Sequence, residues 1–252
     1  MINHKGHLEN LNIELYPDFN EVFESDQLKG IFYPLCKITN IETSPDQPLY
    51  FVSSNGIWTN ENIKNENNQT GFTCFELKNG KYSFNGNLNV YIGHKEAKEI
   101  IKILEDDFQK NGAAYLSKKV KTQIYIKTIK ENFDLNFGDL DKEYFLETFY
   151  QFSVNKLNYK QTGNFGTFRH IIDGWGKPDE ISPVVYEIKD DNSTGFTDIE
   201  INQEFLFPKS ITIDKYEKIG YTIGHEFFTD GNDTYLLFDK TNKRALCINH
   251  YS

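Results

Sequence analysis

The stretch that decides the fold class is GFTCFELKNGKYSFNGNLNVYI, residues 71–92. Its Asn79-Gly80 pair accepts the positive φ angles of a type I′ turn, which joins two antiparallel strands. We therefore predict a hairpin of strands 71–77 and 81–84. A second Asn-Gly pair then leads into an apolar run at 88–92, which indicates a third strand. The whole stretch is expected to form a three-stranded meander.

Directly after this stretch the hydrophobic pattern changes to a helical period. Residues 94–111 place apolar side chains on one helical face, and Asn111-Gly112 predicts where that helix ends. A second helix is expected over 141–157, capped by Asp139 or Asp141. Its phenylalanines fall on one side and predict a core-facing stripe: Phe145, Phe149 and Phe152.

Residues 118–133, between these two helices, fit two patterns. Val120, Thr122, Ile124 and Ile126 alternate as in a strand, but Val120 and Ile124 also fit a helical spacing. The sequence alone leaves both structures open for this segment.

Strand-like runs flank the helical middle at both ends of the chain. Residues 59–70 contain five Asn and few apolar side chains, which indicates an exposed loop. Beta-rich ends around helices predict an α+β fold, antiparallel and β-rich, with two or three helices in the middle of the chain. We expect one α+β domain over 1–252, with two lobes, 1–92 and 93–252, as the alternative. The further strand-like runs are 31–35, 49–52, 184–188, 204–207, 220–223, 235–238 and 245–248.

Composition restricts the classes of partner. The chain has 252 residues, is 38% hydrophobic and 15% aromatic, and carries a net charge of -10. The aromatic content suffices for a substantial core. The acidic balance argues against nucleic acid and anionic membranes as partners, because both attract clustered Lys and Arg. It serves either solubility alone or attraction to a basic protein.

The sequence also bears on location and on the state of the cysteines. No apolar run of signal-peptide type starts the chain, and none approaches a membrane span, so we expect a cytoplasmic protein. Cys36, Cys74 and Cys247 are widely spaced and lie in apolar runs. That pattern predicts buried thiols rather than a disulfide framework or a zinc site.

The densest group of chemistry-bearing residues is FGTFRHIIDGWGKPDEIS, residues 165–182. His170 and Asp173 are three apart, so they can share a helix face, and such pairs serve in acid–base catalysis. Trp175 stands between two glycines, which indicates a turn. The stretch is therefore interpreted as a structural turn, a binding loop or a catalytic element, and no nucleophile is identifiable beside it.

A second candidate segment is GHEFFTDGNDTYLLFD, residues 224–239. His225, Glu226, Asp230 and Asp233 offer an imidazole and carboxylates, which suit hard cations. The segment lacks the HExxH motif of zinc peptidases and the pattern of an EF-hand loop. Asp-Gly-Asn-Asp more commonly forms a tight turn before a strand. The sequence indicates no cofactor and no metal site.

The order of several motifs carries a family resemblance. FYPLCKITN (32–40), PLYFV (48–52), HIIDGWGKP (170–178), YEIKDD (186–191) and TDGNDTYLLF (229–238) follow one another along the chain. This series resembles the YwqG-like family of bacterial proteins, and the closing segment is similar to SUKH-type immunity proteins. The resemblance supplies no catalytic residue; it implies a bacterial protein with a binding role.

The leading hypothesis from the sequence is a bacterial protein-binding module, an immunity protein that masks a basic protein such as a toxin. Its main rival is an enzyme or small-ligand protein with a pocket near His170 and His225, which requires the two candidate segments to meet. A third reading is an accessory structural domain without a discrete site. The absence of a complete catalytic set favours a protein that is not an enzyme.

Overall fold

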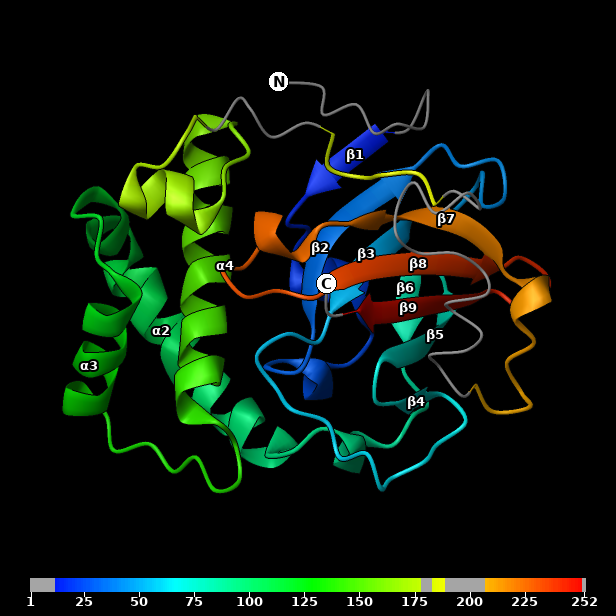
Figure 1. Ribbon diagram of the computed structural model, residues 1–252, viewed down its shortest axis with the longest axis horizontal. Helices are drawn as coiled ribbons and strands as arrows, with labels where there is room; N and C mark the ends of the chain where they lie inside the picture. Colours follow the sequence, from blue (N-terminus) through cyan, green and yellow to red (C-terminus); the bar gives the residue numbers. More distant parts are fainter. Residues whose placement is uncertain (1–11, 178–182, 189–206, 251–252) are drawn as a thin grey trace.

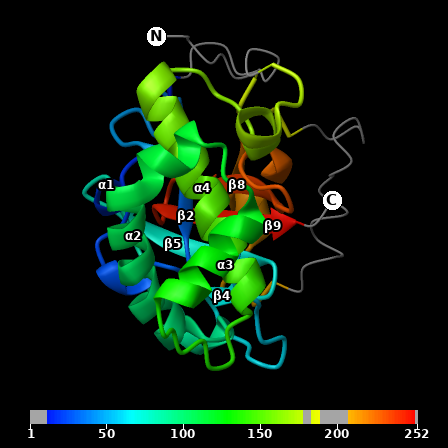
Figure 2. The same cartoon turned by 90° about the vertical axis from the view of Figure 1, so that its left-hand side faces the viewer.

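The computed structural model describes residues 12–177, 183–188 and 207–250. Three long helices lie on one side of the molecule and two antiparallel sheets on the other (Figure 1). The view turned by 90° shows the helices as a layer in front of the sheets (Figure 2). The fold is α+β with helices in the middle of the chain, as the sequence predicts.

The strands form a small and a large sheet. The small sheet has the order β1-β2-β3, and the large one the order β4-β5-β9-β8-β7, with β6 paired to β5. Every pairing within the two sheets is antiparallel. The bounds are β1 (Asn12–Leu15), β2 (Tyr33–Thr39), β3 (Leu49–Ser53), β4 (Asn68–Gln69), β5 (Phe72–Lys78), β6 (Lys81–Ser83), β7 (Glu217–Thr222), β8 (Asp233–Asp239) and β9 (Arg244–His250).

The large sheet is apolar on both faces, because its strands alternate between two buried clusters. In β9, Ala245 and Cys247 belong to the main core, whereas Leu246 and Ile248 belong to a second, smaller core. Strand β3 of the small sheet packs against β8 and β9 on the main-core side. The second core is closed by residues from the segment before β7, such as Ile211 and Tyr216.

The predicted hairpin is confirmed, but the third strand of the meander is wrong. Strands β5 and β6 meet at Asn79-Gly80, both with positive φ angles of 50° and 77°. Residues 88–90 instead form the 3-10 turn η2 (Leu88–Val90), because the Asn87 side chain accepts a hydrogen bond from the Asn89 backbone N–H. The expected loop 59–70 also ends in a strand, since Asn68 and Gln69 form β4.

The two ends of the chain share one sheet. Strand β5 pairs with β9, with Cys74 opposite Leu246. Segments 1–92 and 93–252 therefore both contribute strands to the large sheet, and residue 92 does not separate two sheets. The run 184–188 forms no strand but a single bridge between Tyr186 and Tyr221. Residues 204–206 of the predicted run 204–207 lie outside the described residues.

Helix α2 (His94–Ser117) is longer than the sequence predicts. Gly112 does not end it. Asp107 accepts hydrogen bonds from Asn111, which precedes the glycine, and from Tyr115, which follows it, and these bonds hold the helix together across Gly112. Gly112 is buried there, and an added Cβ would lie 2.6 Å from the Phe108 ring. The tight packing explains why a glycine stands inside the helix.

The ambiguous segment is helix α3 (Thr122–Asn132). Its buried residues, Thr122, Tyr125, Ile126 and Ile129, follow the helical period. Ile124, which completes the strand-like alternation, is 56% exposed. Burial therefore follows the helical pattern and not the alternating one.

Helix α4 (Lys142–Thr162) lies between the other two long helices and the sheets (Figure 1). Asp141 caps it, as predicted, by accepting hydrogen bonds from the backbone N–H groups of Glu143 and Tyr144. The predicted phenylalanine stripe is buried, but so are side chains on other faces, such as Tyr150 and Gln151. Because α4 is packed on several sides, it positions residues of both cavities described below.

The remaining helical segments are short. Among the described residues no helix has the length and apolar composition needed to cross a membrane. All three cysteines are buried free thiols, as predicted. The short segments are α1 (Phe19–Val22), the 3-10 turns η1 (Asp26–Leu28), η5 (Ile213–Lys215) and η6 (Gly224–Glu226), and the π-helical turn η3 (Arg169–Asp173).

Candidate functional site

The first predicted segment is a surface turn whose polar groups bond locally. His170 is half-buried, and its Nδ1 lies 3.0 Å from the Thr167 hydroxyl. Asp173 forms an ion pair with Lys121, the residue that precedes α3. Trp175 follows the turn and is 68% exposed. These contacts hold the π-helical turn η3 in place and bring no second catalytic group to His170.

The second predicted segment is partly buried and connects β7 to β8 at the end of the large sheet. Asp233 accepts a hydrogen bond of 2.8 Å from the Gly224 backbone N–H, and burial raises the pKa of its carboxyl. The exposed His225 has its Nδ1 2.9 Å from the Thr229 carbonyl oxygen. Asp230 is exposed, and its carbonyl oxygen accepts a hydrogen bond from the Asn55 amide.

Glu226 is buried like Asp233, with only 9% of its surface exposed. The Tyr186 hydroxyl donates to its Oε1 at 2.9 Å, but its Oε2 has no hydrogen-bond partner among the described residues. Burial raises the pKa of this carboxyl to about 8, and the charge of Asp233 acts in the same direction. Glu226 therefore holds its proton more tightly than an ordinary glutamate does.

The two predicted segments meet through the rings of Phe165 and Phe227, whose centroids lie 5.4 Å apart, but their polar candidate residues are not brought together. Among the described residues, no hydrogen bond, ion pair or ring contact links His170, Asp173 or Trp175 to a polar residue of the second segment. The cavities beside Tyr33, Trp58 and Gln123 are lined by neither His170 nor His225. Within the described ranges, no three His, Cys, Asp or Glu side chains are placed to hold a metal ion.

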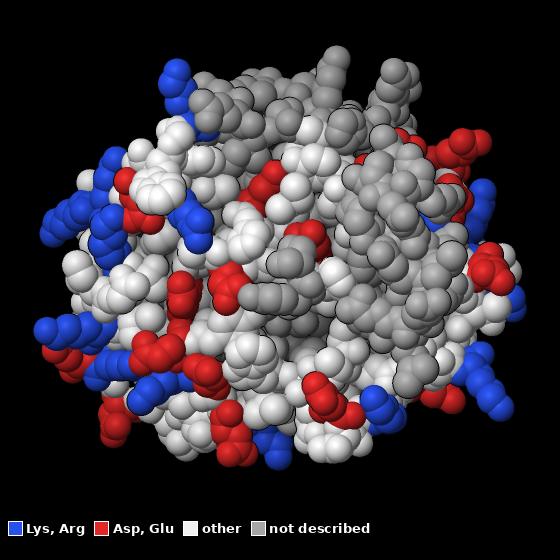
Figure 3. Space-filling model, in the orientation of Figure 1, with Lys and Arg blue, Asp and Glu red and all other residues white. Residues whose placement is uncertain are grey.

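One predicted residue, Asp230, does line a cavity. This cavity of about 310 Å³ lies beside the start of α4 and is called the Trp58 site below. In Figure 3, acidic side chains gather over α4 on the face toward the viewer. The site consists of Trp58, Tyr144, Asn232 and the four carboxylates of Asp141, Glu143, Glu147 and Asp230.

Trp58 is exposed over 56% of its surface, yet its position is fixed. Its indole N–H donates to Asp141 Oδ2 at 3.3 Å, and its ring lies against Tyr144 with centroids 4.9 Å apart. Its carbonyl oxygen accepts a hydrogen bond from the Ile92 backbone N–H. An exposed aromatic ring held by such contacts loses little conformational entropy on binding a partner.

The loop that carries Trp58 approaches α4 closely at Gly56. Gly56 has a φ of +89°, and an added Cβ would lie 2.8 Å from the Thr148 Cβ. The neighbouring Asn55 is buried and donates to the Thr148 hydroxyl and to the Asp230 carbonyl oxygen. Its own Oδ1 accepts from the Tyr144 hydroxyl. Asn55 thus connects the three chain segments that form the Trp58 site.

The carboxylates of the site are only partly compensated. Lys130 pairs with Glu143, and the Gln151 amide donates to Glu147 at 2.7 Å. Burial raises the pKa of Glu147, and the nearby charges of Asp230 and Glu143 raise it further. Like charges held close together repel, so a cation that enters the site relieves this repulsion.

The site offers an aromatic face and several acceptor oxygens to a cationic side chain. A guanidinium or ammonium group over an indole is attracted by the ring quadrupole, and carboxylates form charge-assisted hydrogen bonds with it. Sequence reasoning found Asp141 as a cap and Asp230 as a turn residue, but it missed Trp58. The only available signal was a single Trp inside a polar loop.

Comparison of the chain with protein-family models, curated proteins and solved structures gives no significant match.

Proposed function

We propose that this protein is a protein-binding module whose Trp58 site receives a Lys or Arg side chain of a basic partner. The observation that carries the proposal is the pairing of a fixed, exposed tryptophan with four carboxylates around one cavity. Tryptophan is enriched among the residues that dominate interface energies. The net charge of -10 adds long-range attraction for a basic protein.

The partner class includes basic toxins, which immunity proteins neutralise by covering them. The sequence resemblance to YwqG-like and SUKH-type proteins motivates this choice. We expect coexpression of the protein to rescue bacterial cells from such a toxin encoded beside it. Rescue that is lost with Trp58→Ala and kept with Trp175→Ala would support the choice, whereas no rescue by the unaltered protein would contradict it.

The cation preference of the site can be measured directly, because the chain contains only two tryptophans. In a Trp175→Phe variant, Trp58 is the single indole reporter. We expect an oligo-arginine peptide to change its fluorescence saturably, and an oligo-glutamate peptide to have no effect. Equal responses to both peptides, or none to either, would refute the proposal.

A matched pair of variants separates the site from the overall charge. Glu147→Gln/Asp230→Asn removes two charges from the Trp58 site, and Glu99→Gln/Asp106→Asn removes two from exposed positions on α2. The first change should weaken peptide binding about tenfold, since it removes partners of the cation. The second should alter it by less than about twofold, because exposed charges act weakly at a distance. Equal losses would show that only net charge matters.

A further inference from the structure

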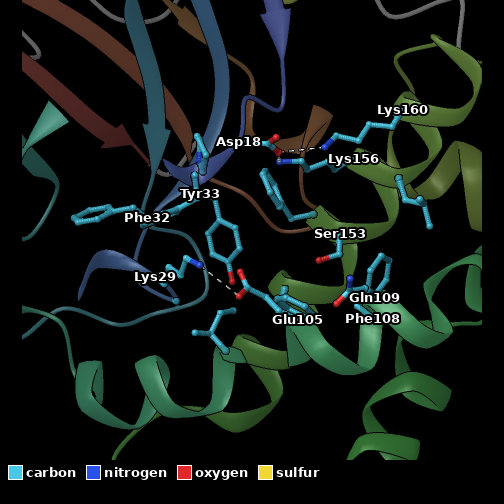
Figure 4. Close-up of a pocket in the computed structure, with 17 residues that line it drawn as sticks. Asp18, Lys29, Phe32, Tyr33, Glu105, Phe108, Gln109, Ser153, Lys156 and Lys160 are labelled. Atoms are coloured by element: carbon cyan, nitrogen blue, oxygen red, sulfur yellow. Dashed lines mark hydrogen bonds and ion pairs between the residues drawn. The ribbon is translucent and has the colours of Figure 1, made fainter. Parts of the chain in front are cut away.

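A second and larger cavity lies where β2 faces helices α2 and α4. Its volume is about 480 Å³, which falls in the range of small-molecule sites. Figure 4 shows side chains from all three elements directed toward it. Its wall is mostly apolar and aromatic, with Phe32, Tyr33, Ile101, Phe108, Phe149 and Phe152 among the lining residues.

One polar group of this wall lacks a partner. Tyr33 is 5% exposed, and its hydroxyl oxygen is buried without a hydrogen bond among the described residues. In Figure 4 its ring extends from β2 toward Glu105. Ser153 of α4 adds a second hydroxyl to the wall. A buried hydroxyl without a partner costs free energy, which a ligand with an acceptor atom would recover.

One end of the cavity carries more positive than negative charge. Lys29, at the other end, lies 3.7 Å from Glu105 and 3.8 Å from Asp26, so its charge is matched. At the positive end a single carboxylate, Asp18, lies 2.9 Å from the Lys156 ammonium and 3.1 Å from that of Lys160. Two lysines thus face one carboxylate at this end of the cavity, in a chain whose net charge is -10.

Lys156 is the most confined of these ammonium groups. Its side chain is 21% exposed, and burial lowers its pKa despite the hydrogen bond to Asp18. A cation that has lost part of its water gains from a further anionic partner. The end of the cavity at Lys156 and Lys160 is therefore suited to an anion.

We infer that this cavity binds a small apolar carboxylate, aromatic or medium-chain aliphatic, whose carboxylate lies at Lys156 and Lys160. Its apolar body packs against Phe108, Phe149 and Phe152, and one of its acceptor atoms accepts a hydrogen bond from the Tyr33 hydroxyl. A neutral apolar molecule would not compensate the excess positive charge at Lys156 and Lys160, and an amine would increase it. The site uses no residue of the Trp58 site, so the inference is independent of the proposed function.

Calorimetric titration of the full chain with ligands of one shape and different charge tests this inference. The probes are 2-naphthoate, 2-naphthalenemethanol and 2-naphthylmethylamine, with decanoate as the aliphatic carboxylate. We expect at least one of the two carboxylates to bind, about tenfold or more tighter than the neutral alcohol, and the amine not to bind. No binding of either carboxylate at millimolar concentration, or equal binding of carboxylate and amine, would overturn it.

Variants locate the binding. Ser153→Leu extends an apolar side chain from α4 into the cavity and should weaken every probe about tenfold or more. Lys156→Met should weaken the carboxylates severalfold and leave the alcohol unchanged. Lys102→Met, on the exposed side of α2, should change nothing. Unaltered carboxylate binding in both Ser153→Leu and Lys156→Met would overturn the inference, and the second variant decides if the first fails to fold.

Discussion

The two tryptophans of this chain are both exposed, but only Trp58 is held in place beside a cavity lined by carboxylates. Trp175 follows a turn in which Asp173 is already paired with Lys121. Trp58 donates a hydrogen bond to Asp141 and packs against the Tyr144 ring. It lies beside carboxylates whose negative charge is only partly compensated by lysines. The sequence draws attention to Trp175, because its neighbours crowd together along the chain. The structure favours Trp58, because its neighbours meet only in the folded molecule.

The largest expected difference between the Trp58 loop and the Trp175 turn is the loss of stability when a glycine of each is replaced by alanine. Gly56→Ala should lower the free energy of unfolding by about 2–4 kcal/mol, because it adds a clash with Thr148 to a strained positive φ. Gly174→Ala, with a φ of +72° but no atom within 4 Å of the added Cβ, should cost only about 1 kcal/mol. Urea unfolding measures both. Equal losses would show that the Gly56 loop is not packed tightly on α4.

The next contrast concerns the buried Glu226 near the Asp230 loop. Its folded-state pKa of about 8 lies above the usual value of 4.5, so the folded protein binds the proton more tightly. The stability that this group contributes is therefore fully present below about pH 4.5 and is lost as the pH rises toward 8. Glu226→Gln should remove this loss, which amounts to about 3 kcal/mol between pH 5 and pH 8.

Urea unfolding at several pH values checks this, with Glu61→Gln as an exposed control. The control should keep the pH slope of the unaltered protein. A Glu226→Gln variant with that same slope would contradict the burial argument.

A smaller effect is expected on binding at Glu147. Its pKa is raised by burial and by Asp230, so part of its charge appears only above the usual range for glutamate. A bound cation favours the ionised form, and affinity for oligo-arginine should therefore rise as the pH increases above about 4.5. Glu147→Gln should reduce affinity severalfold at pH 7 and flatten this rise. Titrations at pH 5 and pH 7 measure the difference; an unchanged pH dependence would exclude Glu147 from the contact.

The smallest effect is expected at the Trp175 turn. Asp173→Asn breaks the ion pair with Lys121, whose two side chains are 32% and 51% exposed. Solvent screens such a pair, so the free energy of unfolding should change by less than about 1 kcal/mol. Urea unfolding at low and high salt measures it. A larger loss would mean that the turn is a structural element on which α3 depends.

Local signals account for the parts of the fold that the sequence predicts. The Asn79-Gly80 turn, the Asp141 cap and the apolar strand runs near the C-terminus all depend on neighbours in the chain. The end of α2 was mispredicted because contacts around Asp107 and Phe108 override the helix-ending tendency of Gly112. Likewise, the burial of Tyr125 favours the helix α3 over the strand that the alternating apolar residues of this segment also allow.

The candidate site was predictable only in fragments. Asp141 and Asp230 stood out as a helix cap and a turn residue, each for a local reason. Their convergence with Trp58 depends on Asn55, which bonds Thr148 and the Asp230 carbonyl oxygen across more than 90 residues of chain. No periodicity or motif in one sequence reports a contact of that kind.

The role of Trp58 in binding is tested most directly by calorimetric titration of oligo-arginine into the unaltered protein, Trp58→Ala and Trp175→Ala. We predict that Trp58→Ala weakens binding by about 2 kcal/mol, roughly thirtyfold, as expected for an anchoring tryptophan. Trp175→Ala should bind as the unaltered protein does. Equal affinities of all three proteins, or a greater loss with Trp175→Ala, would contradict the assignment of the binding surface to the Trp58 site.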